Sequence, residues 1–145
     1  MNTSLGALSD DPFVKQQYRI TKMSDMNGAF PHLSPSATWV LMDEHPDSID
    51  DGYFLNRESS TPAWIDLPAS YHDGGASFSF ADGHSDRHRW QNASTKQPAR
   101  AYGINPTLPM AITDGLQDYS WVLSHMSVER NPETYTAPGY PGNSY

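Results

Sequence analysis

Apolar and polar positions alternate most regularly between residues 76 and 90. The stretch Ala-Ser-Phe-Ser-Phe-Ala at 76–81 places an aromatic ring at every second position of its centre, which is typical of a half-buried strand. Asp82-Gly83 follows at once, and Asp-Gly is a favoured pair for a two-residue type I′ turn. We therefore predict an antiparallel hairpin in which residues 85–90 return beside the first strand.

The register of this hairpin follows from counting outward from a two-residue turn. The count pairs Phe80 with Ser85 and Phe78 with Arg87. Both rings then anchor the core, and Ser85 and Arg87 share their face. The opposite face would gather polar side chains, namely Ser77, Ser79, His84, Asp86 and His88.

Other elements are shorter. Residues 38–42, Thr-Trp-Val-Leu-Met, predict a buried central strand, and residues 53–55 a second apolar strand after an intervening loop. Apolar side chains at helical spacing predict one short amphipathic helix over residues 115–126. Residues 1–35 are mixed, with a short element from Phe13 to Met23 and a turn-rich run from Asn27 to Pro35. Residues 131–145 predict an extended tail.

Composition limits the chain to one small domain over residues 1–145. Only 37% of residues are hydrophobic, but 12% are aromatic, and 10 Gly with 12 Pro indicate many turns. The predicted fold class is α+β, with a small antiparallel sheet and long loops. The absence of cysteine excludes disulfides and thiolate metal sites. No apolar run approaches the ~18 residues of a membrane span, and the start lacks an export signal, so the chain as written is expected to be soluble and cytoplasmic, with no membrane partner.

Charge points toward a cation. A formal charge of −8 repels phosphate backbones, so nucleic acid is not an expected partner. Five carboxylates fall in the loop of residues 43–52, and Ca²⁺ takes six to eight oxygen ligands. The spacing is not that of an EF-hand, and a solvated acidic loop is the simpler alternative. With two neighbours that would complete the shell, the predicted calcium ligands are Asp43, Glu44, Asp47, Asp50, Asp51, Asp66 and Asp82.

Two motifs carry a resemblance to a known family. His72, nine further residues and then Asp82-Gly83 resemble the motif that names the prepilin-type-processing-associated H-X9-DG proteins, and residues 39–54 resemble the acidic loop of the same group. The resemblance implies a pseudopilin-like head with a small antiparallel sheet and a calcium loop, acting by contacts with pseudopilin or type II secretion subunits in the periplasm or outside the cell. The leader and the long hydrophobic N-terminal helix of that family are not seen in this sequence.

Alternative functions rest on other residues. His84, Asp86 and His88 at i, i+2 and i+4, with Ser77 and Ser79 opposite, would suit a calcium- or zinc-dependent hydrolase of small esters or lactones. The exposed face of a hairpin is polar in any case, and no further hydrolase motif accompanies these residues. His72 fits a structural hydrogen bond better than catalysis, and Asp82-Gly83 fit a turn. The four tryptophans are expected in the core or at its rim, with a calcium-dependent carbohydrate-binding module as the alternative.

Overall fold

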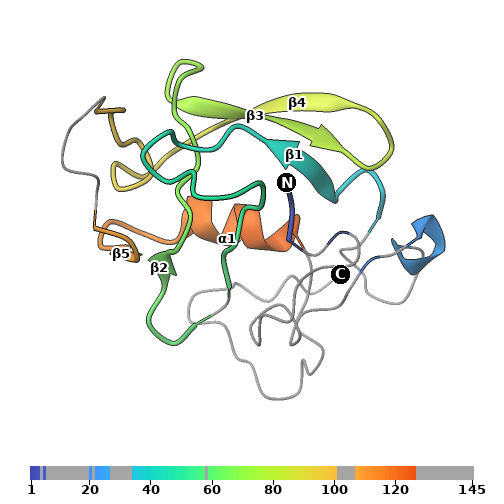
Figure 1. Ribbon diagram of the computed structural model, residues 1–145, viewed down its shortest axis with the longest axis horizontal. Coiled ribbons are helices and arrows are strands. Elements are labelled where there is room, and N and C mark those ends of the chain that lie inside the picture. The colour runs from blue at the N-terminus through green and yellow to red at the C-terminus, as the bar shows by residue number, and fades with distance from the viewer. Residues whose placement is uncertain are drawn as a thin grey trace.

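The computed structural model describes residues 1–3, 5, 20, 22–26, 34–57, 59–100 and 107–126. These residues form two small antiparallel sheets and one α-helix, which confirms the α+β class (Figure 1). The larger sheet has the order β1-β3-β4, and the smaller one pairs β2 with β5. The elements are η2 (Met23–Met26), β1 (Trp39–Met42), β2 (Ala63–Trp64), β3 (Gly75–Phe80), β4 (Ser85–Arg89), β5 (Met110–Ala111) and α1 (Gln117–Ser124).

The core lies between the larger sheet and α1, and it is built mainly from rings. Phe78 of β3 makes edge-to-face contacts with Trp39, Trp90 and Trp121. Trp39 also joins β1 to the helix, because its backbone N–H and its indole N–H donate to the carbonyls of His125 and Val122. Trp39, Trp64 and Trp90 are buried and Trp121 is partly buried, which confirms their prediction as core and rim residues.

The predicted hairpin is present, but its turn is one residue longer than expected. The Phe80 N–H donates to the His84 carbonyl at 2.9 Å, and the Gly83 N–H donates to the Phe80 carbonyl at 3.0 Å. Three residues, 81–83, therefore form the loop, and Gly83 takes the left-handed conformation that a three-residue loop requires (φ 94°). The prediction of a two-residue type I′ turn is wrong, because Asp82 does not have a positive φ.

One extra loop residue exchanges the two faces of the returning strand. Ser77 pairs with Arg87 and Phe78 with Asp86, because side chains alternate with a period of two. His84, Asp86 and His88 thus lie on the face of Phe78 and Phe80, on the helix side. The predicted core-side position of Ser85 and Arg87 is wrong: they are exposed and share the other face with Ser77 and Ser79.

The predicted central strand at 38–42 is an edge strand. β3 occupies the centre of the sheet, and β1 pairs with β3 alone among the strands of its sheet. A bulge at Val40 shifts the register between Trp39 and Leu41, so Trp39 points into the core while Leu41 is 54% exposed. The apolar run at 53–55 makes only an isolated bridge from Phe54 to Asn2, not a strand.

Helix α1 confirms the amphipathic helix predicted at 115–126, and a reciprocal bond anchors its first turn. The buried Asp118 carboxylate accepts the backbone N–H groups of Gln91 and Asn92, while the Asn92 side chain accepts the Asp118 N–H. None of the described helices is long and apolar enough to cross a membrane. The predictions for residues 27–33 and 131–145, and most of that for 13–23, lie outside the described residues.

Candidate functional site

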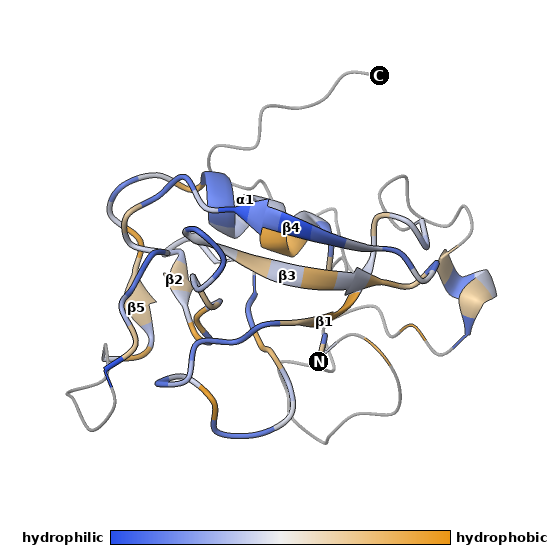
Figure 2. Ribbon diagram, turned by 90° about the horizontal axis from the view of Figure 1, so that it is seen from above, coloured by the Kyte–Doolittle hydropathy of each residue, from blue (hydrophilic) through white to orange (hydrophobic). Residues whose placement is uncertain are grey.

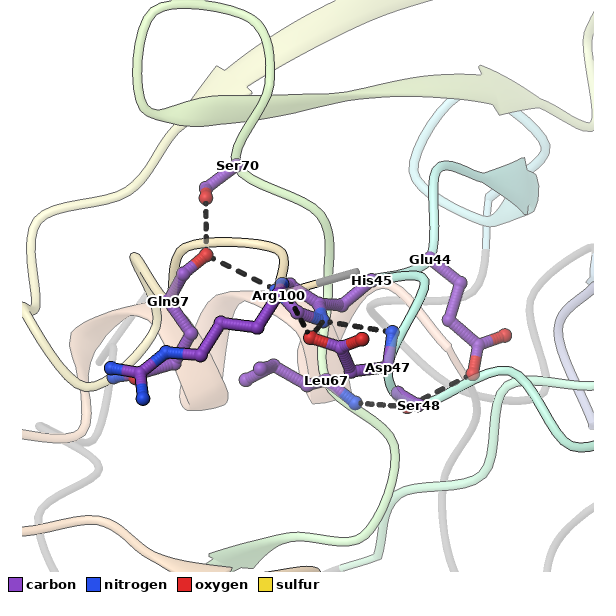
Figure 3. A network of polar contacts seen from close by, with 8 residues as sticks. All are labelled: Glu44, His45, Asp47, Ser48, Leu67, Ser70, Gln97 and Arg100. Atoms are coloured by element: carbon purple, nitrogen blue, oxygen red, sulfur yellow. Dashed lines mark hydrogen bonds and ion pairs between the residues drawn. The ribbon is translucent and has the colours of Figure 1, made fainter. Parts of the chain in front are cut away.

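The acidic segment at 43–52 is a loop, as predicted, and a buried histidine organises its first half. His45 is fully buried, and its Nδ1 accepts the Asp47 N–H at 3.2 Å (Figure 3). Its Nε2 lies 3.2 Å from the Gln97 carbonyl oxygen, which can only accept. The proton therefore sits on Nε2, and the neutral ring ties the loop to residues 97–100.

A serine fixes the next turn of the loop and one of its carboxylates. Ser48 Oγ accepts the Leu67 N–H at 2.9 Å and donates to Glu44 Oε1 at 3.0 Å. The His45 N–H donates to the Leu67 carbonyl and the Ala69 N–H to the Asp43 carbonyl, both at 2.9 Å, so the loop is joined to residues 66–69 at three points. The Glu44 side chain is thereby held next to the segment that carries Asp66.

Four of the seven predicted calcium ligands are coupled electrostatically where the loop meets residues 66–69, as the pKa values of two of them indicate. Burial raises the pKa of Glu44 to about 7, with the charge of Asp66 adding to the rise and the Ser48 hydrogen bond opposing it. Burial likewise raises the pKa of Asp66 to about 6, against a hydrogen bond from the Leu55 N–H and with the charges of Asp50 and Asp51 adding. We call Glu44, Asp50, Asp51 and Asp66 the acidic cluster.

One positive charge already lies within reach of this cluster. The amino group of Met1 donates to the Gly52 carbonyl at 2.9 Å. Burial lowers the pKa of this amino group, whereas the charges of Glu44, Asp51 and Asp66 raise it. Three members of the acidic cluster thus act electrostatically on one amino group, as expected for carboxylates that are crowded and partly desolvated.

The other three predicted ligands lie elsewhere. Asp43 Oδ2 accepts the Ser77 N–H and lies 3.0 Å from His72 Nε2. Asp47 Oδ2 accepts the Arg100 N–H at 2.9 Å. Asp82 lies at the tip of the β3–β4 hairpin, so it is separated from the acidic cluster by the length of β3. The seven carboxylates therefore do not form a single set.

A calcium ion fits the chemistry of the acidic cluster, but not the arrangement of its side chains as they stand. Carboxylate oxygens are the ligands that Ca²⁺ prefers. Within the described ranges, however, no three His, Asp or Glu side chains are placed to hold an ion together. Asp50, Asp51 and Gly52 are exposed at the end of the loop. An ion would bind by drawing these residues toward Glu44 and Asp66.

The two ends of the H-X9-DG motif lie at the two ends of β3. His72 precedes the strand and joins it to Asp43 after β1. Asp82 follows the strand, where its carboxylate accepts the His84 N–H at 3.1 Å, and that hydrogen bond together with the His84 ring lowers the Asp82 pKa. Gly83 supplies the positive φ of the turn. All three positions hold the hairpin in shape.

His84, just before β4, and His88 within it do not form the arrangement expected of a hydrolase. The His84 ring stacks on Phe80 with centroids 4.3 Å apart, and its Nδ1 lies 2.6 Å from Asp82 Oδ1. The expected pairing with Ser77 and Ser79 as nucleophiles is wrong, because both serines lie on the opposite face of the sheet. Catalysis by His84, Asp86 and His88 stays a prediction, and neither of these two serines lies on their face of the sheet.

His88 has a different partner that sequence reasoning did not predict. Its ring stacks on Trp121 at 3.8 Å, and Trp121 stacks in turn on His125 at 4.3 Å. Burial lowers the pKa of both histidines. Helical spacing of Trp121 and His125 was a usable signal, since residues four apart share a helix face. The burial of His45 had a weaker signal, namely the following Pro46 that marks a tight turn.

Comparison with known proteins leaves the family open: no family model, no curated protein and no solved structure matches the chain. The likeness to the H-X9-DG proteins therefore rests on the two motifs alone, and the functional conclusion rests on the geometry described above.

Proposed function

We propose that this chain is a non-catalytic, pseudopilin-like head domain that acts through protein contacts in a secretion or pilus-like assembly, and that one calcium ion closes its acidic loop. The observation that supports this most directly is that Asp50, on a loop already anchored by His45 and Ser48, raises by its charge the pKa values of both Glu44 and Asp66, with Asp51 adding to the rise at Asp66. A prearranged loop with exposed ends is suited to folding around an ion.

The electrostatics of the acidic cluster favour a hard divalent cation. Glu44 and Asp66 have pKa values of about 7 and 6, so near neutral pH both are partly protonated when no cation neutralises their neighbours. A divalent ion offsets the repulsion among four carboxylates more effectively than a single amino group does. Glu44 and Asp66 would hold the ion from the buried side, and Asp50 and Asp51 from the exposed side.

The non-catalytic part of the proposal follows from the roles of the motif residues. His72, Asp82 and Gly83 each contribute to the backbone geometry of the hairpin. Since these positions support the resemblance to the H-X9-DG proteins, the resemblance concerns a scaffold and not a reaction. The role in an assembly is taken from that same resemblance.

Calorimetric titration with Ca²⁺, and with Mg²⁺ for comparison, tests the ion. Binding should release protons at pH 6–7, because the ion displaces them from Glu44 and Asp66, and saturating calcium should raise the melting temperature. The double variant Asp50→Asn/Asp51→Asn should bind at least about tenfold more weakly. A matched control with the same change in charge, Asp73→Asn/Asp86→Asn, should bind as the wild type does.

Two results would contradict the proposal. If millimolar calcium gave neither a heat of binding nor a shift in melting temperature, the proposed calcium site would be refuted. Turnover of chromogenic esters or lactones by the purified chain, abolished in His84→Ala/His88→Ala while the fold persists, would replace the head-domain role with the hydrolase alternative.

A further inference from the structure

The side of the larger sheet that faces away from α1 carries short side chains along its centre and opposite charges at its two edges. Figure 1 shows α1 below this sheet, and Figure 2 views the sheet from above, with β4 in the blue of hydrophilic residues. Leu41 is among the large hydrophobic side chains exposed on the molecule. We define the open face by Leu41, Asp43, Ser77, Ser79, Ser85 and Arg87.

The open face is organised in two rows that run across the strands. In the first row, Asp43 contacts Ser77 through two hydrogen bonds, and Ser77 pairs with Arg87. In the second row, Leu41 pairs with Ser79 and Ser79 with Ser85. Each row therefore has a serine of β3 at its centre. The first row ends in opposite charges, and the second has an apolar side chain at one end and a short polar one at the other.

Such rows are complementary to themselves. A twofold axis parallel to the strands and passing over β3 would place β1 of one copy opposite β4 of the other. Each Asp43 would then face the partner's Arg87, and each Leu41 would face the partner's Ser85. Ser77 and Ser79 would meet their own counterparts on the axis, where small side chains let the two sheets approach closely.

Both charges are available for such a contact. The Asp43 side chain is 39% exposed, although it already bonds to His72. Among the described residues, the Arg87 guanidinium has no carboxylate partner, whereas the neighbouring Arg89 is paired with Asp73 at 3.4 Å. Arg87 is thus the positive group of this face that has no counterion within the described part of its own chain.

From this arrangement we infer that the open face is a homotypic docking surface, on which a second copy of this chain packs sheet against sheet about a twofold axis. The inference deepens the proposed role through protein contacts, and it rests on that role for its place in an assembly but not on calcium. Three strands spaced ~4.8 Å apart offer only a small area, so the isolated domains should associate weakly, with Kd roughly 0.1–1 mM. Attachment to a shared assembly would raise the effective concentration into that range.

Sedimentation velocity of the whole chain in EDTA tests the association. A series from about 10 μM to about 1 mM should show a monomer–dimer equilibrium that weakens as salt is added. Arg87→Glu should weaken the dimer at least about tenfold, because it replaces two attractive pairs by two repulsive ones. Lys22→Glu causes the same change in net charge next to η2, away from the open face, and should alter the dimer less than about twofold.

A second measurement locates the contact. The chain has no cysteine, so Ser79→Cys introduces a single thiol that is close in size to the serine it replaces. Because Ser79 lies on the expected axis, two such thiols would meet across the dimer, and mild oxidation should join Ser79→Cys chains by a disulfide much faster than Ser60→Cys chains, whose thiol lies in an exposed loop. A head-to-tail contact would not bring the same position of two copies together.

The inference is overturned if the chain stays monomeric to about 1 mM, if Arg87→Glu and Lys22→Glu weaken association equally, or if Ser79→Cys chains cross-link no faster than Ser60→Cys chains. Calcium titration of Arg87→Glu separates this outcome from failure of the proposed function. The variant should bind calcium as the wild type does, so loss of the dimer with retained calcium binding would concern the open face alone.

Discussion

Asp118 is expected to be among the most sensitive positions of the chain to substitution. Its carboxylate is buried in the first turn of α1 and accepts the Asn92 N–H at 2.9 Å and the Gln91 N–H at 2.9 and 3.1 Å. These bonds join the helix to the segment that follows β4. Replacing Asp118 with alanine removes the acceptor and leaves both donors in place.

The loss can be estimated donor by donor. The Asn92 N–H is buried, and an orphaned buried donor costs about 1–3 kcal/mol. Gln91 is exposed, so water can accept a hydrogen bond from its N–H, and losing the Asp118 carboxylate there should cost about 1 kcal/mol or less. Asp118→Ala should therefore lower the free energy of unfolding by about 1–4 kcal/mol. Asp118→Asn keeps one acceptor oxygen and should lose about half as much.

Urea unfolding followed by tryptophan fluorescence measures both variants, since four tryptophans report on the core. Asp86→Ala is the control, because Asp86 is exposed and, within the described residues, its carboxylate accepts the N–H of the next residue alone. The control should stay within about 0.5 kcal/mol of the wild type. The reasoning is refuted if Asp118→Ala also stays within that range at an unchanged urea dependence.

Two further predictions concern the acidic cluster and the tryptophans. The folded-state pKa values of Glu44 and Asp66, about 7 and 6, lie above their ordinary values of 4.5 and 3.8, so the folded state binds more protons and stability in EDTA should rise as the pH falls from about 8 to about 5. Melting scans across that range should show a gain on the order of 1–2 kcal/mol after solvent screening, reduced in Glu44→Gln, and a flat profile would contradict it. Trp90 donates its indole N–H to the Ala69 carbonyl at 2.7 Å, whereas the buried Trp64 indole N–H has no acceptor among the described residues. Trp90→Phe should therefore cost about 1–2 kcal/mol more in chemical unfolding than Trp64→Phe, and equal losses would count against this account.

The sequence predicts the strands of the hairpin better than their pairing. Alternation around Phe78 and Phe80 identifies a half-buried strand because one face must reach the core. Asp82-Gly83 suits both a two-residue and a three-residue loop, since Gly83 supplies a positive φ in either. Local sequence therefore does not decide the register, which depends on contacts of β4 with α1 such as that of His88 with Trp121.

The acidic loop shows a similar division. Pro46 and Gly52 identify a loop, and the crowding of carboxylates identifies a candidate cation site. Which carboxylates meet depends on where residues 66–69 pack, and nothing in the local pattern links Asp66 to Glu44. The burial of His45 could not be predicted either, because a histidine among acidic residues is expected on the polar surface. Only the structure shows that both of its ring nitrogens form hydrogen bonds.

The length of the hairpin tip decides how mutations along β4 should be interpreted. With three residues between the strands, positions 84, 86 and 88 share the helix side, and positions 85, 87 and 89 share the other side. In a saturation library, position 88, whose ring is half-buried against Trp121, should tolerate the fewest replacements, whereas the exposed positions 84–87 and 89 should tolerate many as far as folding is concerned. Deleting one residue from the tip would exchange the faces of all these positions and turn His88 away from Trp121, so a single codon there should affect folding more than most substitutions in the strand itself.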